Sequence, residues 1–402
     1  MRLKTRHFMK DKTWPVAILL LAAWALSSCG RLPGTSAPLP DGQPAEAQAV
    51  ESPAQTPALE FIQLPEGFTI RVFAQELDKP RMLALGPDGA VYVAERGAGR
   101  ITRLVDADGD GQAETRQAVA AGLDAPTSLA FHPDDWLYVG ETTRILRLSQ
   151  PDSQGVYQER QAIIADLPSG GHVTRTVAIS PDGARLYVSI GSSCNVCLES
   201  DPRRAAIWQY NLDGSAGTLF AKGLRNAVGL TFAPGSGELW TTNNGRDLLG
   251  DDLPPDTIQA VFQGQDFGWP RCHAGVIPDP EFGAAGSCKE VSPPAVKLQA
   301  HSAPLGLAFY SAGQFPSRYQ GGLFVALHGS WNRSVPTGYK VIWIPFHSGV
   351  PGQAEDFATG WLQDERAWGR PVDVLQSATG SLLISDDAGG IIYLISYTGQ
   401  EK

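Results

Sequence analysis

Short apolar segments alternate with turn residues over most of the chain, and the pattern repeats. In the first copy, an apolar segment at residues 83–85 is followed by the turn Gly-Pro-Asp-Gly at 86–89 and an alternating segment at 91–93. The same order returns at 129–139 and at 177–188. Proline presets φ and Asp-Gly tolerates positive φ, and a tight hairpin turn requires both properties. Each copy therefore predicts two antiparallel strands joined by a hairpin.

Looser copies and a further strand in most units complete a set of six units. The looser copies begin at Leu230, Leu307 and Val372, and the further strands lie at 100–104, 144–148, 207–211, 341–345 and 391–395. Repeats of about 45 residues with several strands each are typical of propeller blades, which pack around an axis. We therefore predict an all-β fold, a six-bladed β-propeller over residues 59–402, with insertions in the longer units four to six. A pair of β-sandwiches is the alternative.

The first 58 residues differ from the repeats. A basic start precedes an apolar stretch at 14–26, which is shorter than the ~20 residues of a membrane-spanning helix. The stretch ends in Leu26-Ser27-Ser28-Cys29, the order of a lipobox, so we predict a lipoprotein signal peptide at 1–28 and lipidation of Cys29. An ordinary signal peptide with an incidental cysteine is the alternative. Residues 29–58 are rich in Pro, Ala, Gly and Gln and predict a disordered tether. We expect an exported protein, anchored by lipid and facing the periplasm or the cell surface.

Charge and cysteine content narrow the choice of partners and compartment. The net charge of -10 opposes binding to nucleic acid, whose affinity for proteins comes mainly from phosphate neutralisation. The cysteines after Cys29 are Cys194, Cys197, Cys272 and Cys288. An even number in an exported chain predicts disulfides, and sequence proximity favours Cys194–Cys197 and Cys272–Cys288. Other pairings stay open, and a zinc site built from both pairs is the alternative.

Charged and polar residues stand next to the first strand of several predicted blades. The set consists of Arg81, His172, Arg225, Asn226 and Arg370, joined by His328, Asn332 and Arg333 after a strand of the fifth unit. In a propeller these positions converge on the axis. Arginine binds carboxylates through two N–H groups and stacks on flat rings, so the set suits a planar polyanion. Any one of these residues alone is better explained by a surface or loop-capping role, and the ligand role rests on their recurrence at equivalent positions of the blades.

Two acidic segments have the composition of calcium sites. Asp106, Asp108, Asp110, Gln112 and Glu114 alternate with turn glycines, as in the first half of an EF-hand loop. Gln117 stands where that loop requires glutamate, so we predict a structural calcium loop between blades, with a solvated acidic turn as the alternative. Gly245, Arg246 and Asp247 offer carbonyl and carboxylate oxygens for a second calcium near the axis.

These segments together resemble the soluble quinoprotein glucose/sorbosone dehydrogenase family, particularly its sorbosone and pyranose dehydrogenase branch. The resemblance extends from about residue 64 to 397. It rests on Lys79-Pro80-Arg81, Gly223-Leu224-Arg225-Asn226, Phe267-Gly268-Trp269-Pro270, the segments 86–89 and 250–256, His328-Gly329-Ser330-Trp331-Asn332-Arg333 and the segment 385–390. It implies a six-bladed propeller that binds pyrroloquinoline quinone (PQQ) and Ca²⁺ and oxidises a sugar by hydride transfer to the quinone.

The resemblance also implies roles for individual residues. His172 matches the histidine that takes the proton of the sugar C1 hydroxyl, and Arg225 matches the arginine that stabilises charge on the quinone oxygen. The residues that match the clamp on the cofactor's carboxylates are Arg81, His328 and Arg370. The segment Gly245-Arg246-Asp247 resembles the loop whose backbone carbonyls hold calcium.

Two departures from the family pattern affect the catalytic residues. Gly171 stands before His172, where the glucose dehydrogenases have an aspartate, and their active-site glutamine has no match in the second unit. Asp124 is the residue that we expect to orient His172 in place of that aspartate. These departures concern catalytic competence and sugar preference rather than the fold.

The leading hypothesis is a quinoprotein sugar dehydrogenase that passes electrons to a respiratory quinone or cytochrome. A second hypothesis is a non-catalytic propeller that binds a ligand or a protein partner at the cell surface. Activity with any aldose would distinguish the two. A calcium-centred hydrolase, such as a lactonase, is disfavoured because the axial residues are mainly Arg and His rather than carboxylates.

Overall fold

A computed structural model describes residues 58–149 and 151–399. The predicted leader, the predicted lipidation site Cys29 and the tether before Ala58 lie outside the described residues. Within the described part of the chain, no helix is long and apolar enough to cross a membrane.

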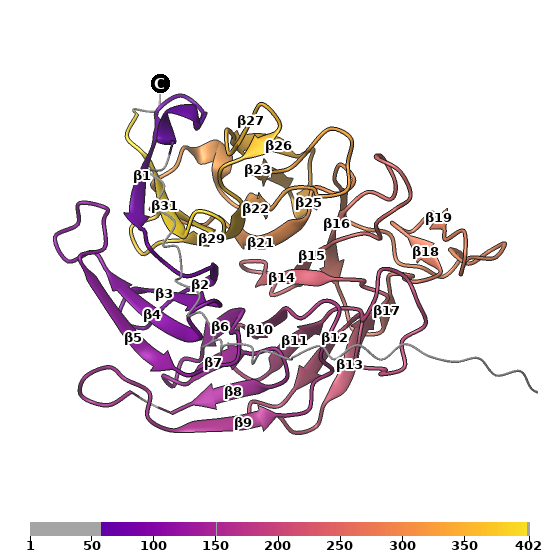
Figure 1. The fold of residues 1–402 in the computed structure, drawn as a ribbon, viewed down its shortest axis with the longest axis horizontal. Coiled ribbons are helices and arrows are strands. Elements are labelled where there is room, and N and C mark those ends of the chain that lie inside the picture. The colour runs from indigo at the N-terminus through magenta and orange to yellow at the C-terminus, as the bar shows by residue number, and fades with distance from the viewer. Residues whose placement is uncertain (1–57, 150, 400–402) are drawn as a thin grey trace, which may run out of the picture. The chain divides into compact units, whose positions relative to one another are not determined.

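Six sheets, antiparallel except for one short pair in blade three, surround a common axis, and the predicted six-bladed β-propeller is confirmed (Figure 1). Blade one contains β2 (Pro80–Leu85), β3 (Val91–Glu95), β4 (Arg100–Val105) and β5 (Thr115–Ala121). Blade two contains β6 (Ser128–Phe131), β7 (Leu137–Gly140), β8 (Ile145–Leu148) and β9 (Arg160–Ile164). Blade three contains β10 (Arg175–Ile179), β11 (Leu186–Ile190), β12 (Ala206–Tyr210), β13 (Thr218–Lys222) and β17 (Gln265–Asp266).

The other three blades repeat this order. Blade four contains β14 (Ala227–Phe232), β15 (Leu239–Asn243), β16 (Thr257–Val261) and β20 (Val296–Lys297). Blade five contains β21 (Pro304–Phe309), β22 (Leu323–Leu327), β23 (Lys340–Ile344) and β26 (Glu355–Ala358). Blade six contains β29 (Pro371–Gln376), β30 (Leu382–Asp386), β31 (Ile391–Tyr397) and β1 (Phe68–Ala74).

Short elements decorate the later blades, as the longer units predict. They are the hairpins β18 (Cys272–His273) with β19 (Ile277–Pro278), β24 (Phe346–His347) with β25 (Val350–Pro351), and β27 (Leu362–Gln363) with β28 (Arg366–Ala367), and the 3-10 turns η1 (Leu59–Phe61) and η2 (Ser317–Tyr319). Strand β17 comes from the insertion after β16 and pairs in parallel with β13 of blade three. This pairing places the insertion of blade four beside the loop that leads into β14.

The predicted hairpin turns form where the sequence places Asp and Gly. In the β2–β3 turn, Gly89 has a φ of 78°, a value that costs glycine little. The Asp88 carboxylate accepts a hydrogen bond from the Ala90 N–H at 3.2 Å. In the β6–β7 turn, Asp135 adopts a φ of 65° at the corresponding position. The turn geometry is therefore kept where the glycine is missing.

The hydrophobic core lies between neighbouring blades. Every residue of β3 is buried because this strand is covered on both faces by adjacent sheets, whereas β5 at the rim is mostly exposed. Hydroxyl groups on the second strand of one blade bond the inner strand of the next blade. Thr242 Oγ1 donates to the Leu305 carbonyl at 2.7 Å, and Ser385 Oγ donates to the Arg81 carbonyl at 2.7 Å. These bonds satisfy backbone groups that face another sheet and fix the strands around the axis.

The ring closes through its two ends. Strand β1 is the outermost strand of blade six and pairs antiparallel with β31, from Phe68 opposite Tyr397 to Ala74 opposite Ile392. The Phe68 ring packs edge-on against Phe315 and Phe357, with centroid distances of 4.7 and 5.1 Å. Closure removes the free edge that the last blade would otherwise expose.

Both predicted disulfides form, Cys194–Cys197 and Cys272–Cys288. The alternative of a zinc site that shares all four cysteines is therefore wrong. The first disulfide lies in the loop between β11 and β12, and the second closes the insertion that carries β18 and β19.

Candidate active site

The loops that lead into the inner strands are fixed at one end of the blades by a repeated hydrogen bond. A side chain at the end of the second strand accepts it from the backbone N–H of the loop. The pairs are Glu95 with Asp78 (2.8 Å), Glu141 with Asp124 (2.7 Å), Asn243 with Asn226 (3.1 Å) and Asp386 with Arg370 (2.9 Å). The three carboxylates that accept these bonds are fully buried. The loops that lead into the inner strands of blades one, two, four and six therefore have a defined backbone.

His172 lies on the loop before β10, and its imidazole contacts the loop after β11. Its Nδ1 lies 2.9 Å from Ser192 Oγ and 3.1 Å from the Ser192 carbonyl oxygen. A carbonyl can only accept, and the Ser192 hydroxyl donates to the Cys194 carbonyl at 2.7 Å. The pattern therefore assigns the proton to Nδ1 and leaves Nε2 as the unprotonated nitrogen. Ser192 orients the ring, whereas Asp124, expected in this role, makes no hydrogen bond to it among the described residues.

Burial, followed by the positive charge of Arg225, lowers the pKa of His172 to about 4, although the hydrogen bond with the Ser192 backbone opposes the shift. The imidazole is therefore neutral at neutral pH. A neutral ring with a free Nε2 can accept a proton from a ligand.

Arg225 is buried on the loop between β13 and β14. Neighbouring loops supply hydrogen-bond acceptors on several sides of its guanidinium. Nε donates to the Asn195 carbonyl at 2.9 Å, and Nη2 donates to Asn195 Oδ1 at 3.0 Å and to Asp247 Oδ2 at 2.7 Å. Nη1 donates to the Gly245 carbonyl at 2.6 Å. These contacts hold the positive charge in one place.

Two asparagines extend this group. Asn226 and His172 both pack against Gly191 and so lie beside each other. A Cβ added to Gly191 would lie 2.6 Å from the Cβ of His172 and 2.8 Å from Asn226 Oδ1. Asn332 Nδ2 donates to Asp247 Oδ1 at 3.2 Å, which joins the loop after β22 to the carboxylate partner of Arg225. His172, Arg225, Asn226 and Asn332 are thus brought together as predicted.

A second group of site residues meets at blades one, five and six. Arg81 Nη1 donates to Asp387 Oδ2 at 2.6 Å, and His328 Nε2 lies 2.8 Å from Asp387 Oδ1. Arg370 Nε donates to the His328 carbonyl at 3.1 Å, and Nη2 donates to the Gly329 carbonyl at 2.9 Å. Arg81, His328 and Arg370 therefore lie together, with Asp387 between two of them.

Two predicted site residues have their side chains directed elsewhere. The Arg246 guanidinium pairs with Asp279 and Glu281 in the insertion of blade four. Arg333 donates to the Asp251 carbonyl in the loop after β15. Neither guanidinium is part of the two groups described above.

The backbone carbonyls at Gly245 and Asp247 already accept hydrogen bonds. Arg225 Nη1 donates to the first at 2.6 Å, and Asn195 Nδ2 donates to the second at 3.0 Å. A guanidinium beside the Gly245 oxygen repels a divalent cation at the same place. Each carbonyl oxygen keeps a second lone pair, so a calcium ion at Gly245, Arg246 and Asp247 stays a prediction.

The acidic loop between β4 and β5 brings its carboxylates together. Ligand oxygens of Asp106, Asp108, Asp110 and Glu114 all lie within 4.8 Å of one another. Gln112 turns its amide to Asp110, where Nε2 donates to Oδ2 at 3.2 Å. A calcium ion in this loop stays a prediction.

Sequence reasoning missed three residues of the site, Ser192, Asn195 and Asp387. Asp387 belongs to the motif at 385–390, and Asn195 stands between two closely spaced cysteines. Ser192 carries no local signal, because its contact with His172 depends on how two separate loops meet.

Comparison with known proteins agrees with the resemblance seen in the motifs. Residues 62–398 match the family described as TrAA12-like. An uncharacterized protein of Borreliella burgdorferi is 31% identical over 355 residues, which cover 84% of this chain and 91% of that protein. A pyrroloquinoline quinone-dependent pyranose dehydrogenase of Coprinopsis cinerea is 24% identical across 82% of this chain, and the match spans 54% of that protein, about half its length.

Among solved structures, the holo form of the PQQ domain of the Coprinopsis cinerea pyranose dehydrogenase aligns with a TM-score of 0.74. The sequence identity is 22%, and the alignment covers 83% of this chain and 97% of that domain. A likeness at this identity shows a shared propeller fold.

Proposed function

Since the chain belongs to the TrAA12-like family, we propose that it is a PQQ-dependent dehydrogenase that oxidises a sugar. The observation that carries the proposal is the convergence of a neutral histidine with a free Nε2, a buried arginine and a cluster of further cationic and amide side chains. His172, Arg225 and Arg81 come from three different blades. This arrangement is what a hydride-transfer site for an anionic cofactor requires.

The residues present fit PQQ, a flat molecule that carries three carboxylates. Arg81 Nε, Asn226 Oδ1 and Asn332 Oδ1 are buried without a hydrogen-bond partner among the described residues. A buried polar atom left unpaired costs roughly 1–3 kcal/mol, so its presence favours a ligand at that place. Arg81, His328 and Arg370 would hold carboxylates, while Asn226 and Asn332 would bond the polar edge of the ring.

The chemistry divides between the cofactor and the chain. Bound PQQ supplies a quinone that accepts hydride from the sugar carbon. His172 Nε2 takes the proton of the hydroxyl on that carbon, so that a carbonyl product forms. Ser192 accepts from Nδ1 throughout and stabilises the imidazolium that results. Arg225 places a fixed positive charge near Asn226 and His172, where it would stabilise negative charge on a bound acceptor.

The cellular setting forms a second part of the proposal. We propose that the protein is exported, that Cys29 carries the lipid anchor, and that a respiratory quinone or cytochrome accepts the electrons. The lipobox sequence supports the anchor. The two disulfides support an oxidising compartment, where such bonds form and persist.

A cofactor titration tests the proposal. The purified protein, supplied with Ca²⁺, should bind PQQ saturably and then reduce a dye with at least one sugar from a panel of aldoses. His172→Ala should abolish turnover and leave PQQ binding within about threefold. Absence of saturable PQQ binding would reject the proposal. Binding without turnover on any sugar would favour the non-catalytic propeller instead.

A further inference from the structure

We infer that Asn195, held in the turn closed by the Cys194–Cys197 disulfide, is the positioning residue that sets Arg225 and Asp247 in the site. The consequence for catalysis rests on the proposed function, whereas the positioning itself does not. The inference stands on the hydrogen bonds of one side chain and on the way that its turn is fixed.

Asn195 makes five hydrogen bonds through its carbonyl and its side chain, and four of them reach Arg225 or Asp247. Its carbonyl accepts from Arg225 Nε at 2.9 Å and from Trp269 Nε1 at 3.3 Å. Its side-chain Oδ1 accepts from Arg225 Nη2 at 3.0 Å and from the Asp247 N–H at 2.7 Å. Its Nδ2 donates to the Asp247 carbonyl at 3.0 Å. One residue of blade three therefore fixes both an arginine and an aspartate that belong to the loops flanking β14 and β15.

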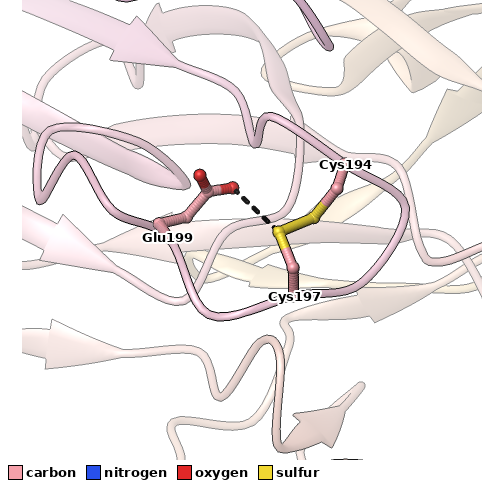
Figure 2. A group of neighbouring side chains, drawn as sticks. All are labelled: Cys194, Cys197 and Glu199. Atoms are coloured by element: carbon pink, nitrogen blue, oxygen red, sulfur yellow. Dashed lines mark hydrogen bonds between the residues drawn. A yellow bond between two sulfur atoms is a disulfide. The ribbon is translucent and has the colours of Figure 1, made fainter. Parts of the chain in front are cut away.

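The disulfide closes the turn on either side of Asn195. Figure 2 shows the bond between Cys194 and Cys197, with the Glu199 carboxylate beside the Cys197 sulfur. Glu199 accepts hydrogen bonds from the backbone N–H and the hydroxyl of Ser193, both at 2.7 Å. A short closed turn of this kind leaves Asn195 little backbone freedom.

The same turn also reaches His172. Ser192 Oγ donates to the Cys194 carbonyl at 2.7 Å and accepts a hydrogen bond from His172 Nδ1. The two side chains that the proposed chemistry needs, His172 and Arg225, are thus both held by residues within the segment 192–195. No other segment of the described residues hydrogen-bonds to both side chains.

Asn195 also determines which donor of Arg225 stays free. A guanidinium has five N–H groups, and four of them are engaged by Asn195, Asp247 and Gly245. The remaining N–H, on Nη1, is the one that can face a ligand. Loss of the Asn195 side chain would free one more donor, on Nη2, whereas the Asn195 carbonyl would still accept from Nε.

The test compares Asn195→Ala and Asn195→Asp with wild type. Aspartate can still accept from Arg225 Nη2 and from the Asp247 N–H, but it cannot donate to the Asp247 carbonyl. Asn211→Ala is the matched control, because Asn211 lies in the β12–β13 turn at the opposite end of the same blade. The first readout is hydrogen exchange of the Asp247 amide without PQQ. The second is kcat and KM of the PQQ-loaded protein.

We expect Asn195→Ala to speed exchange at Asp247 by tenfold or more and to lower kcat by tenfold or more, with KM for the sugar within threefold. Asn195→Asp should recover most of kcat, and Asn211→Ala should change neither readout. Wild-type exchange at Asp247 together with kcat within twofold in Asn195→Ala would overturn the inference. So would an equal kcat loss in Asn195→Ala and Asn195→Asp with unchanged exchange.

The disulfide gives a second, independent variant. In Cys194→Ser/Cys197→Ser, exchange at Asp247 should rise and kcat should fall, and adding Asn195→Ala should then change kcat by less than threefold, because both changes act through one contact. Full additivity would overturn the role of the turn. If Asn195→Ala does not fold, this variant and Asn195→Asp decide the question. If wild type neither binds PQQ nor oxidises a sugar, the proposed function fails, and the exchange readout still decides the positioning.

Discussion

Nδ1 of His172 lies 2.9 Å from Oγ of Ser192, and this contact determines which ring nitrogen can act as a base. The Ser192 side chain is fully buried, and its hydroxyl proton is committed to the Cys194 carbonyl. A carboxylate at this position would raise the basicity of the imidazole, whereas a hydroxyl and a carbonyl leave the ring neutral. A serine therefore takes the orienting role that the family pattern led us to expect of an aspartate.

Replacement of Ser192 should reduce turnover without emptying the site. In Ser192→Ala, Nδ1 keeps only the Ser192 carbonyl at 3.1 Å, and the ring gains rotational freedom. We expect kcat to fall by roughly 10-fold, in the range seen for partners that orient a catalytic or metal-bound histidine, with PQQ affinity unchanged. Steady-state kinetics and a PQQ titration check this. Ser180→Ala, in the turn after β10, is the control, and an equal loss there would contradict the prediction.

The depressed pKa of His172 predicts a low acid limit for activity. Burial is the main cause, and the pKa of His172 lies at about 4, so Nε2 becomes protonated only as the pH falls through about 4. We expect kcat/KM for the sugar to be independent of His172 protonation above about pH 5 and to fall below it. A pH–rate profile measured with a stable cofactor complex tests this. An acid limb at the ordinary histidine pKa of about 6.5 would contradict it.

The lowered pKa of His172 also makes folding stability depend on pH, with a sign opposite to that of a histidine paired with a carboxylate. Because the folded-state pKa is below the unfolded value, the unfolded chain takes up a proton first as the pH falls. His172 therefore lowers the free energy of unfolding progressively from about pH 6.5 to about pH 4. His172→Gln should show a shallower loss of stability over this window in denaturant titrations. Parallel pH dependences would count against it.

Asp387 should contribute stability that acid removes. Burial alone would raise the pKa of Asp387, but the hydrogen bond and charge of His328 and the charge of Arg81 lower it overall. Its contribution is present above the unfolded pKa of about 4 and is lost as the pH falls below it. We expect Asp387→Asn to cost about 1–3 kcal/mol of unfolding free energy at pH 7 and less at pH 3. Asp364→Asn, in an exposed turn, should cost nothing measurable at either pH.

Calcium should raise the melting temperature through the acidic loop of blade one. Four clustered carboxylates repel one another unless a cation neutralises them, and a ligand that binds only the folded state stabilises it. We expect millimolar Ca²⁺ to raise Tm by a few degrees and EDTA to reverse the rise. Asp108→Asn should abolish the response, and Asp182→Asn, in a hairpin turn of blade three, should retain it. A calcium response unchanged by Asp108→Asn would place the ion elsewhere.

The Cys272–Cys288 disulfide should stabilise the insertion of blade four. It joins residues 16 positions apart, and closing a loop of that length in the unfolded chain is worth about 3 kcal/mol. Cys272→Ser/Cys288→Ser should lose roughly that much unfolding free energy in non-reducing denaturant titrations. Equal stability of the variant and wild type would show that the insertion unfolds separately from the blades.

Much of the fold could be predicted from sequence because each blade is a local unit. The turn at 86–89 and its copies predict the hairpins, and close spacing of the cysteines predicts both disulfides. The predicted site residues lie close together where backbone position alone decides, as for His172 and Arg225, which precede inner strands, and their roles stay predictions.

The remaining site contacts depend on loops that meet only in the folded ring. Arg81 and Asp387 are 306 positions apart, and Asn195 and Asp247 are 52 apart. Arg246 and Arg333 were predicted as site residues from their motifs. Instead, the Arg246 side chain pairs with a carboxylate and the Arg333 side chain bonds a backbone carbonyl, both in other loops. Sequence spacing does not predict where either guanidinium points, because both residues lie in loops without a regular backbone period.

Because β1 pairs with β31, the first described strand cannot complete its pairing until the last strand has formed. Thr69 and Ser396 are partners across 327 positions, so the closing contact has a very high contact order. During synthesis the early blades can form hairpins as they emerge, but blade six has an unpaired edge until β31 is complete. A chain that stops short of residue 391 would expose two open edges, one on β30 and one on β1. Such truncated chains should be captured by chaperones or aggregate rather than accumulate as five stable blades.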